Sequence, residues 1–282
     1  MSQYHTPIMV EEVMEGLQVA PGKRFIDATV GGGGHAAEFV KRGGIVLGID
    51  TDTDAVEEVK KSISGTIVQG NFRNIQTIAQ EHGFEHVDGI LFDLGVSSHQ
   101  VDTAGRGFSY RYTDAPLDLR LDQTKGLTAA EYLEHVSEQE LYETLATYSE
   151  EEHSRGIAAA IVGARRAKPV ETTGDLLHIV QSVVGARQSA PTASRIFQAL
   201  RIHINDEFTA LKEGLKGAGE LLKPGGRLAV ISFHSLEDRI VKQYMRSDGW
   251  KLITKRPVCA GERELMENRR SRSAKLRIAE KL

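Results

Sequence analysis

Apolar and polar positions alternate between two spacings along the first third of the chain. Short apolar runs of the kind found in buried strands occupy residues 25–29, 45–49, 65–68 and 87–94. Between and before them, helical spacing predicts helices over residues 8–17, 34–42, 54–62 and 75–82. Strands that alternate with helices form parallel sheets covered on both faces. The pattern therefore predicts an α/β fold with a doubly wound, mostly parallel sheet.

The strand pattern stops after Asp93, and helices follow. We expect these helices over residues 137–148, 151–167, 175–184 and 191–208. Strands resume at residues 227–233, after a turn over residues 223–226, and then at 250–255 and 274–281, the last two as a hairpin pair with a basic connection. We therefore expect a discontinuous sheet domain, residues 1–104 and 206–282, interrupted by an all-helical domain, residues 105–205.

A run of four glycines, Gly31 to Gly34, follows the first predicted strand. Such a run loses much backbone entropy on folding, and its usual use is a close approach of the backbone to a nucleotide-like ligand at a helix N-terminus. The next strand ends at Asp50, about 20 residues beyond the first glycine, where an acid can bind a pair of ribose hydroxyls. The segment therefore predicts a nucleotide-type cofactor site.

Two cofactors are compatible with this loop. Gly31, Gly33 and Ala36 match the loose form of the dinucleotide fingerprint, which leaves an NAD-dependent oxidoreductase open. Asp27, however, would oppose a pyrophosphate, whereas it suits a ligand with positive charge, such as S-adenosylmethionine. Polar or aromatic residues also follow the later strands, so that Asp50 would bind the ribose, Phe72 would stack on the adenine, and Asp93 would lie near the reacting group.

Composition adds limits to this prediction. The chain has 282 residues, 40% of them hydrophobic and 26% charged, and no apolar run approaches the ~18 residues of a membrane helix. Its single cysteine, Cys259, excludes an internal disulfide and a cysteine zinc cluster, so we expect a reduced, cytoplasmic compartment. The net charge is −4, yet residues 239–277 hold 12 Lys and Arg against 4 Asp and Glu. This distribution favours a polyanionic partner along one face.

Motifs along nearly the whole chain resemble one family, the bacterial 16S ribosomal RNA (cytosine-N4)-methyltransferases, which use S-adenosylmethionine. The matching segments are His5-Thr-Pro-Ile-Met9, Asp27-Ala-Thr-Val-Gly-Gly-Gly-Gly-His35, Asp93-Leu-Gly-Val-Ser-Ser-His-Gln100, Arg106-Gly-Phe-Ser109, Pro116-Leu-Asp-Leu-Arg-Leu-Asp122, Arg195-Ile-Phe-Gln-Ala-Leu-Arg201, Ile231-Ser-Phe-His-Ser-Leu-Glu-Asp238 and Arg272-Ser-Ala-Lys-Leu-Arg277. His99 departs from the usual proline, which makes the segment before Gln100 less rigid.

This resemblance implies a Rossmann-like methyltransferase sheet with an inserted helical domain for substrate recognition. It also implies methyl transfer to the exocyclic N4 of a decoding-centre cytosine in 16S rRNA, within the small ribosomal subunit. The cofactor contacts that it implies are Gly33, Gly34, His35, Asp50, Phe72, Asp93 and Gln100. Two alternatives remain at this point: the NAD-dependent oxidoreductase, and a non-catalytic module that binds S-adenosylmethionine and RNA during assembly.

The chemistry points to Asp93 and His234 as catalytic candidates. Asp93 would accept hydrogen bonds from the cytosine amine, and His234, which follows the strand over 227–233, would take up the proton or cap the next helix. Methylation at carbon 5 instead needs a cysteine nucleophile, and Cys259 lies outside every strand-end motif. No cluster with metal-ligand spacing is present. Candidate RNA contacts are Arg165, Arg166, Lys168, Arg269, Arg270 and Arg272.

Overall fold

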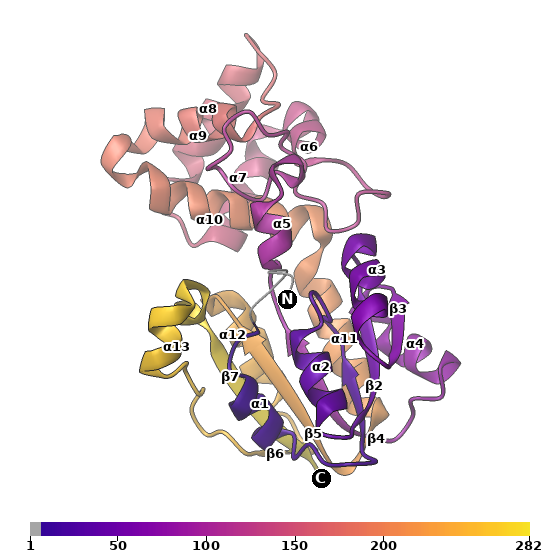
Figure 1. The fold of residues 1–282 in the computed structure, drawn as a ribbon. Helices are drawn as coiled ribbons and strands as arrows, with labels where there is room; N and C mark the ends of the chain where they lie inside the picture. Colours follow the sequence, from indigo (N-terminus) through magenta and orange to yellow (C-terminus); the bar gives the residue numbers. More distant parts are fainter. Residues whose placement is uncertain (1–6) are drawn as a thin grey trace. The chain divides into compact units, whose positions relative to one another are not determined.

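A computed structural model describes residues 7–282, except for the side chains of Ser98 and Arg269. The first two residues of the opening motif, His5 and Thr6, therefore lie outside the described residues. The chain divides into two compact units, residues 1–97 with 208–282, and residues 98–207 (Figure 1). Each unit has its own hydrophobic core, so each is described by itself.

The first unit is built on a seven-stranded sheet in the order β3-β2-β1-β4-β5-β7-β6. Its strands are β1 (Arg24–Asp27), β2 (Ile45–Asp50), β3 (Thr66–Gln69), β4 (Val87–Asp93), β5 (Leu222–Ser232), β6 (Trp250–Leu252) and β7 (Lys275–Lys281). The first five are parallel, and β7 lies between β5 and β6, antiparallel to both. The α/β fold and the final antiparallel pair are thus confirmed.

Helices cover both faces of this sheet. They are α1 (Val10–Gly16), α2 (Gly34–Lys41), α3 (Thr53–Ser62), α4 (Ile75–Glu81), α11 (Glu207–Leu221), α12 (Ser235–Tyr244) and α13 (Glu262–Glu267), with short 3-10 turns η1 (Phe72–Asn74) and η3 (Arg269–Ser273). Apolar residues of α1, α2 and α3 form one core with Phe25 and Leu91, while α4, α11 and α12 form another with Ile26 and Phe92. Successive strand residues serve opposite cores because side chains alternate along a strand. The sheet is therefore doubly wound.

The second unit is helical and carries no strand among its described residues, apart from one isolated bridge between Pro116 and Thr172. Its elements are α5 (Ser98–Asp102), η2 (Ala104–Arg106), α6 (Ala129–His135), α7 (Glu138–Ser149), α8 (Ser154–Arg165), α9 (Thr173–Val184) and α10 (Ala186–Asn205). The sequence analysis missed α6, although Thr128 and Glu131 form a capping box at its start, the signal that marks such a helix.

Two predicted helices have different boundaries in the structure. The helix predicted over 151–167 begins only at Ser154. Just before this start, the Glu151 carboxylate accepts hydrogen bonds from the N–H of His153 and from Arg195, which hold residue 151 outside the helix. The helix predicted over 191–208 is two helices, α10 and α11. Proline lies inside α10, and the chain turns between the two helices at Asp206, where φ is +48°.

The strand predicted over 227–233 also begins earlier, at Leu222, which pairs with Val87. Arg227 pairs with Gly89, so residues 223–226 are extra residues that form a bulge, with φ of +78° at Gly225. The predicted turn therefore lies inside β5 rather than before it.

Candidate active site

Carboxyl groups end three neighbouring strands of the sheet. Asp27, Asp50 and Asp93 are the last residues of β1, β2 and β4, and β1 pairs in parallel with both other strands. Parallel strands present their carboxyl ends at one edge of the sheet, where ligands of open α/β folds bind. The structure thus brings together three acids that lie far apart in the sequence.

Two glycines of the loop between β1 and α2 are closely packed. Gly33 precedes α2 with φ of +78°, and a Cβ there would lie 2.6 Å from Cδ1 of Ile63, which follows α3. At Gly34 a Cβ would lie 2.7 Å from Pro7 Cγ. A non-glycine residue at positive φ is also strained. A side chain at Gly33 or Gly34 would therefore force its neighbours to move.

Asp50 is held by two backbone donors. Its Oδ2 accepts the N–H of Gly31 at 2.8 Å and its Oδ1 accepts the N–H of Asp52 at 2.9 Å. Burial raises the pKa of Asp50 to about 6, with these backbone hydrogen bonds opposing the shift, so the group is mostly ionised at neutral pH. Each carboxylate oxygen keeps a further lone pair, which fits the binding of adjacent ribose hydroxyls.

Asp27 has a different charge state from the one that the sequence suggested. It is 1% exposed, and burial, together with the charges of Asp93 and Asp50, raises its pKa to about 8, against the hydrogen bond from the Thr29 N–H. At neutral pH the group is therefore mostly protonated. Asp27 therefore does not offer a full negative charge to a cationic ligand, and Asp50 carries the charge instead.

Asp93 is positioned by Thr29 and faces the imidazole of His35. Its N–H donates to Thr29 Oγ1 at 2.6 Å, and its Oδ2 lies 3.8 Å from His35 Nδ1. The other ring nitrogen of the buried His35 lies 2.9 Å from the carbonyl oxygen of Ile8, so that nitrogen carries a proton. The sequence analysis missed Thr29, which is marked only by its place in the motif that begins at Asp27.

Phe72 follows β3 and opens η1. Its half-buried ring packs edge-on against Phe92, with the ring centroids 5.5 Å apart, and a Cβ at Gly214 of α11 would approach its Cδ2 to 2.9 Å. Asn71 begins the turn, since its side chain accepts the N–H of Arg73. The ring is thus fixed at the end of β3, while stacking on adenine stays a prediction.

His234 is the N-cap of α12. Its Nδ1 accepts the N–H of Glu237 at 3.4 Å, and its Nε2 lies 3.0 Å from Glu237 Oε1. Glu237 is buried and also accepts the N–H of Phe233. Nδ1 therefore caps the helix, while Nε2 lies beside the Glu237 carboxylate without a hydrogen bond among the described residues, and the catalytic role of His234 stays a prediction. The sequence analysis missed Glu237. The three-residue spacing from His234 to Glu237, which is typical of a capping box, could have identified it.

Gln100, the remaining predicted cofactor residue, is buried on α5 in the helical unit. Its contact with the cofactor stays a prediction.

The predicted RNA contacts differ in how they are held. Lys168 pairs with Asp175 at 2.8 Å, Arg165 donates to the carbonyl of Leu133, and Arg270 donates to the carbonyl of Ser97 at 3.4 Å. Three of the predicted contacts are exposed, namely Arg166, Lys168 and Arg272. The Arg269 side chain lies outside the described residues.

Two further features of the described residues concern metal binding and membrane spanning. Within residues 7–282, no three His, Cys, Asp or Glu side chains come together in a group suited to a metal ion. No helix in the same range is both long and apolar enough to cross a bilayer.

Comparisons with known proteins identify the family. A family model described as the MraW methylase family matches residues 2–282. The chain is 48% identical to "Ribosomal RNA small subunit methyltransferase H" of Deinococcus radiodurans, over 98% of this chain and 89% of that protein. It is 43% identical to the protein of the same name from Symbiobacterium thermophilum, over 100% of this chain and 98% of that protein.

Among solved structures, TrmN from Thermus thermophilus is similar at a TM-score of 0.47 and 14% identity, over 97% of this chain and 48% of that chain. The family model covers almost every residue, and the relatives match along their length, so the assignment does not depend on this remote structural likeness. The chain belongs to the MraW methylase family.

Proposed function

We propose that this S-adenosylmethionine-dependent methyltransferase methylates the exocyclic N4 of a decoding-centre cytosine in 16S rRNA. The family supports methyl transfer, and the names of the relatives support a small-subunit ribosomal RNA substrate. The observation that carries the proposal is the placement of Asp50 and Asp93 at one sheet edge, with the Asp50 carboxylate tied to the N–H of Gly31 in the glycine loop. An NAD-dependent oxidation, which rested on loop glycines and Ala36 alone, is not supported by the family.

The residues at this edge fit the donor. A side chain at Gly33 or Gly34 would force its neighbours to move, and the ionised Asp50 retains lone pairs for the ribose hydroxyls. We assign the adenine to Phe72, and further contacts to the backbone of His35 and to Gln100. When bound, S-adenosylmethionine supplies an activated methyl group on a sulfonium, which becomes a neutral thioether on transfer, so exclusion of water favours the reaction.

Asp93 would act on the acceptor. The exocyclic amine of cytosine donates its lone pair into the ring and is a poor nucleophile, so a hydrogen-bond acceptor that holds its N–H groups favours attack. The Asp93 backbone is fixed by Thr29, and the next turn has φ of +88° at Gly95, close to Phe233. Asp93 can thus orient the amine for in-line displacement. His234 follows β5 and is our candidate to take up the proton after transfer, while its Nδ1 caps the first turn of α12.

The target base must be accessible for this chemistry. The amine of a paired cytosine is engaged in base pairing, so the enzyme needs an unpaired or flipped-out cytosine. We assign recognition of the flanking RNA within the small ribosomal subunit to the helical unit, where Arg166 is exposed, and to Arg272 near the C-terminus.

The test is mass spectrometry of 16S rRNA nucleosides from cells that lack the gene and carry a plasmid copy. We expect N4-methylcytidine at the decoding centre with the wild-type chain and with Asp54→Ala, an exposed acid on α3. Asp93→Ala should abolish the mark. If cells with Asp93→Ala lack the mark but grow like the wild type, an assembly role of the protein is favoured. Persistence of the mark without the gene would refute the proposal.

A further inference from the structure

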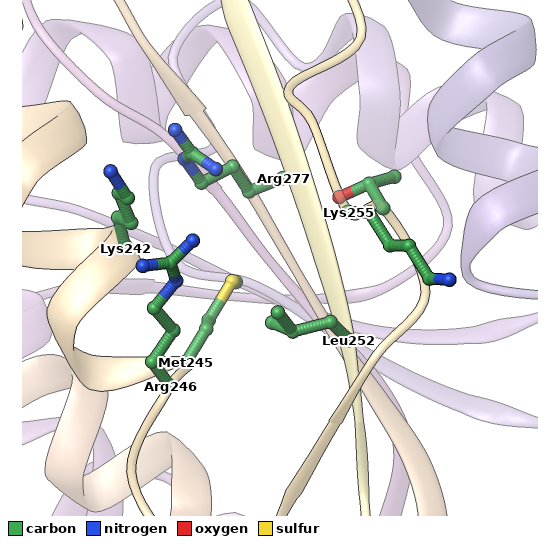
Figure 2. A pocket seen from close by; sticks show the side chains of 7 residues that line it. Lys242, Met245, Arg246, Leu252, Lys255 and Arg277 are labelled. Carbon is green, nitrogen blue, oxygen red and sulfur yellow. The ribbon is translucent and has the colours of Figure 1, made fainter.

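A small basic pocket lies in the first unit between the end of α12, the residues after β6, and β7. It is lined by Lys242, Met245, Arg246, Leu252, Thr254, Lys255 and Arg277 and is shallow, with a volume of about 10 Å³, so that an anion would bind across its opening (Figure 2). Figure 2 shows the amine of Lys242 and the guanidinium groups of Arg246 and Arg277 on one side of the pocket, while the Lys255 chain leads away from them. Three cationic groups therefore gather at one place.

One carboxylate interacts with two of these charges and forms an ion pair with one of them. Asp238 on α12 accepts two hydrogen bonds from Arg277, from Nε at 2.6 Å and from Nη2 at 2.9 Å. Burial raises the pKa of Asp238, but the hydrogen bond and charge of Arg277, with Lys275 and Lys242, outweigh it and lower the pKa overall. A guanidinium has five N–H donors, and this pair uses two of them. Arg277 is thus held rigidly with donors to spare.

The other two cations have no such partner. Neither Lys242 nor Arg246 lies within ion-pair distance of a carboxylate in the described part of the chain, and both are exposed. Both lie at the C-terminal end of α12, where the helix dipole favours a cation. The helix dipole explains a basic residue at this end of α12. It does not explain why Arg277 of β7 lines the same pocket. Like charges that line one pocket repel one another, and an anion between them removes that repulsion.

We propose that this pocket binds a backbone phosphate of the RNA substrate, away from the reacting base. The inference rests on the proposed function, which supplies the polyanion. Arginine donates two parallel hydrogen bonds to phosphate oxygens, and lysine adds a point charge. The helix α12 begins at His234, beside the β5 end of the proposed active edge, and its ten residues span about 15 Å. The pocket can therefore hold the RNA strand at a distance from the methylated cytosine.

The experiment uses the full-length chain and a protein-free transcript of the 16S decoding region. Binding of the transcript is measured at several salt concentrations for the wild type and for Lys242→Gln/Arg246→Gln. The control is Lys60→Gln/Lys61→Gln, which removes the same charge from two lysines in the last turn of α3 and so reproduces any helix-dipole effect. Affinity for S-adenosylmethionine is measured for all three chains, and Arg246→Gln alone serves if the double variant folds poorly.

For two lost phosphate contacts, the slope of log affinity against log salt should become shallower by about 1.4, and RNA affinity near 0.1 M salt should fall about 25-fold, or about fivefold for Arg246→Gln alone. Cofactor affinity and the α3 control should stay at the wild-type level. Transcript binding by the pocket variant equal to that of the control would overturn the inference, even if methylation of whole subunits fell, since that pattern indicates an acidic protein partner. Failure of the proposed function is a separate result: the wild-type chain would leave 16S rRNA unmethylated.

Discussion

At the scale of single residues, Asp50 carries the charge of the proposed cofactor site. Asp50→Asn keeps the size of the side chain and removes its charge and one acceptor. A hydrogen bond to a charged group contributes about 1.5–3 kcal/mol, so affinity for S-adenosylmethionine should fall about 10- to 100-fold. Isothermal titration calorimetry measures this, with Asp54→Asn on the exposed first turn of α3 as the control. Equal affinities for both variants would show that Asp50 does not bind the cofactor.

The raised pKa of Asp27 predicts how the free energy of unfolding depends on pH. Its folded pKa of about 8 lies above the ordinary value of 3.8, so the folded state binds the proton more tightly than the unfolded state. Folding free energy from this group is therefore present at low pH and is lost as pH rises from about 4 to about 8. In Asp27→Asn, the free energy of unfolding should fall less over that range than in the wild type. Urea titrations at several pH values test this, and parallel pH profiles would contradict it.

At the scale of elements, the turn between β1 and α2 depends on glycine for two reasons that can be separated. Gly33→Ala meets both positive φ and the side chains of α3, whereas Gly22→Ala meets a similar φ of +77° with nothing within 4 Å. The φ penalty is about 1–2 kcal/mol for each, and overpacking adds about 1–3 kcal/mol at Gly33 only. Denaturant unfolding should show this difference. Equal losses of unfolding free energy in the two variants would mean that the side chains near Gly33 move aside at no cost in free energy.

The strands and their polar ends could be predicted from the sequence, because buried apolar runs and a following acid are local signals. Asp50 and Asp93 were identified this way. The bulge at Gly225 and the turn at Asp206 between α10 and α11 could not be predicted, since each depends on pairing or packing with distant residues. The protonation of Asp27 was also beyond the sequence, because it follows from burial. By contrast, α6 carried a readable capping box at Thr128.

At the scale of the whole molecule, the chain is two units with separate cores. The helical unit buries 19 apolar residues of its own, among them Leu141, Ile161 and Leu200. A core of this size in about 110 residues is enough for independent folding. We expect the isolated segment 98–207 to show helical circular dichroism and a cooperative thermal transition, without measurable affinity for S-adenosylmethionine. A non-cooperative transition would show that its packing depends on the sheet unit.

We propose that the methyl donor binds at the carboxyl ends of β1, β2 and β4. A crystal structure of the chain with S-adenosylhomocysteine tests this placement. We expect the ribose hydroxyls on the carboxylate of Asp50, the adenine against Phe72, and the sulfur end near Asp93. Electron density for the nucleoside elsewhere on the molecule, with this sheet edge empty, would contradict it.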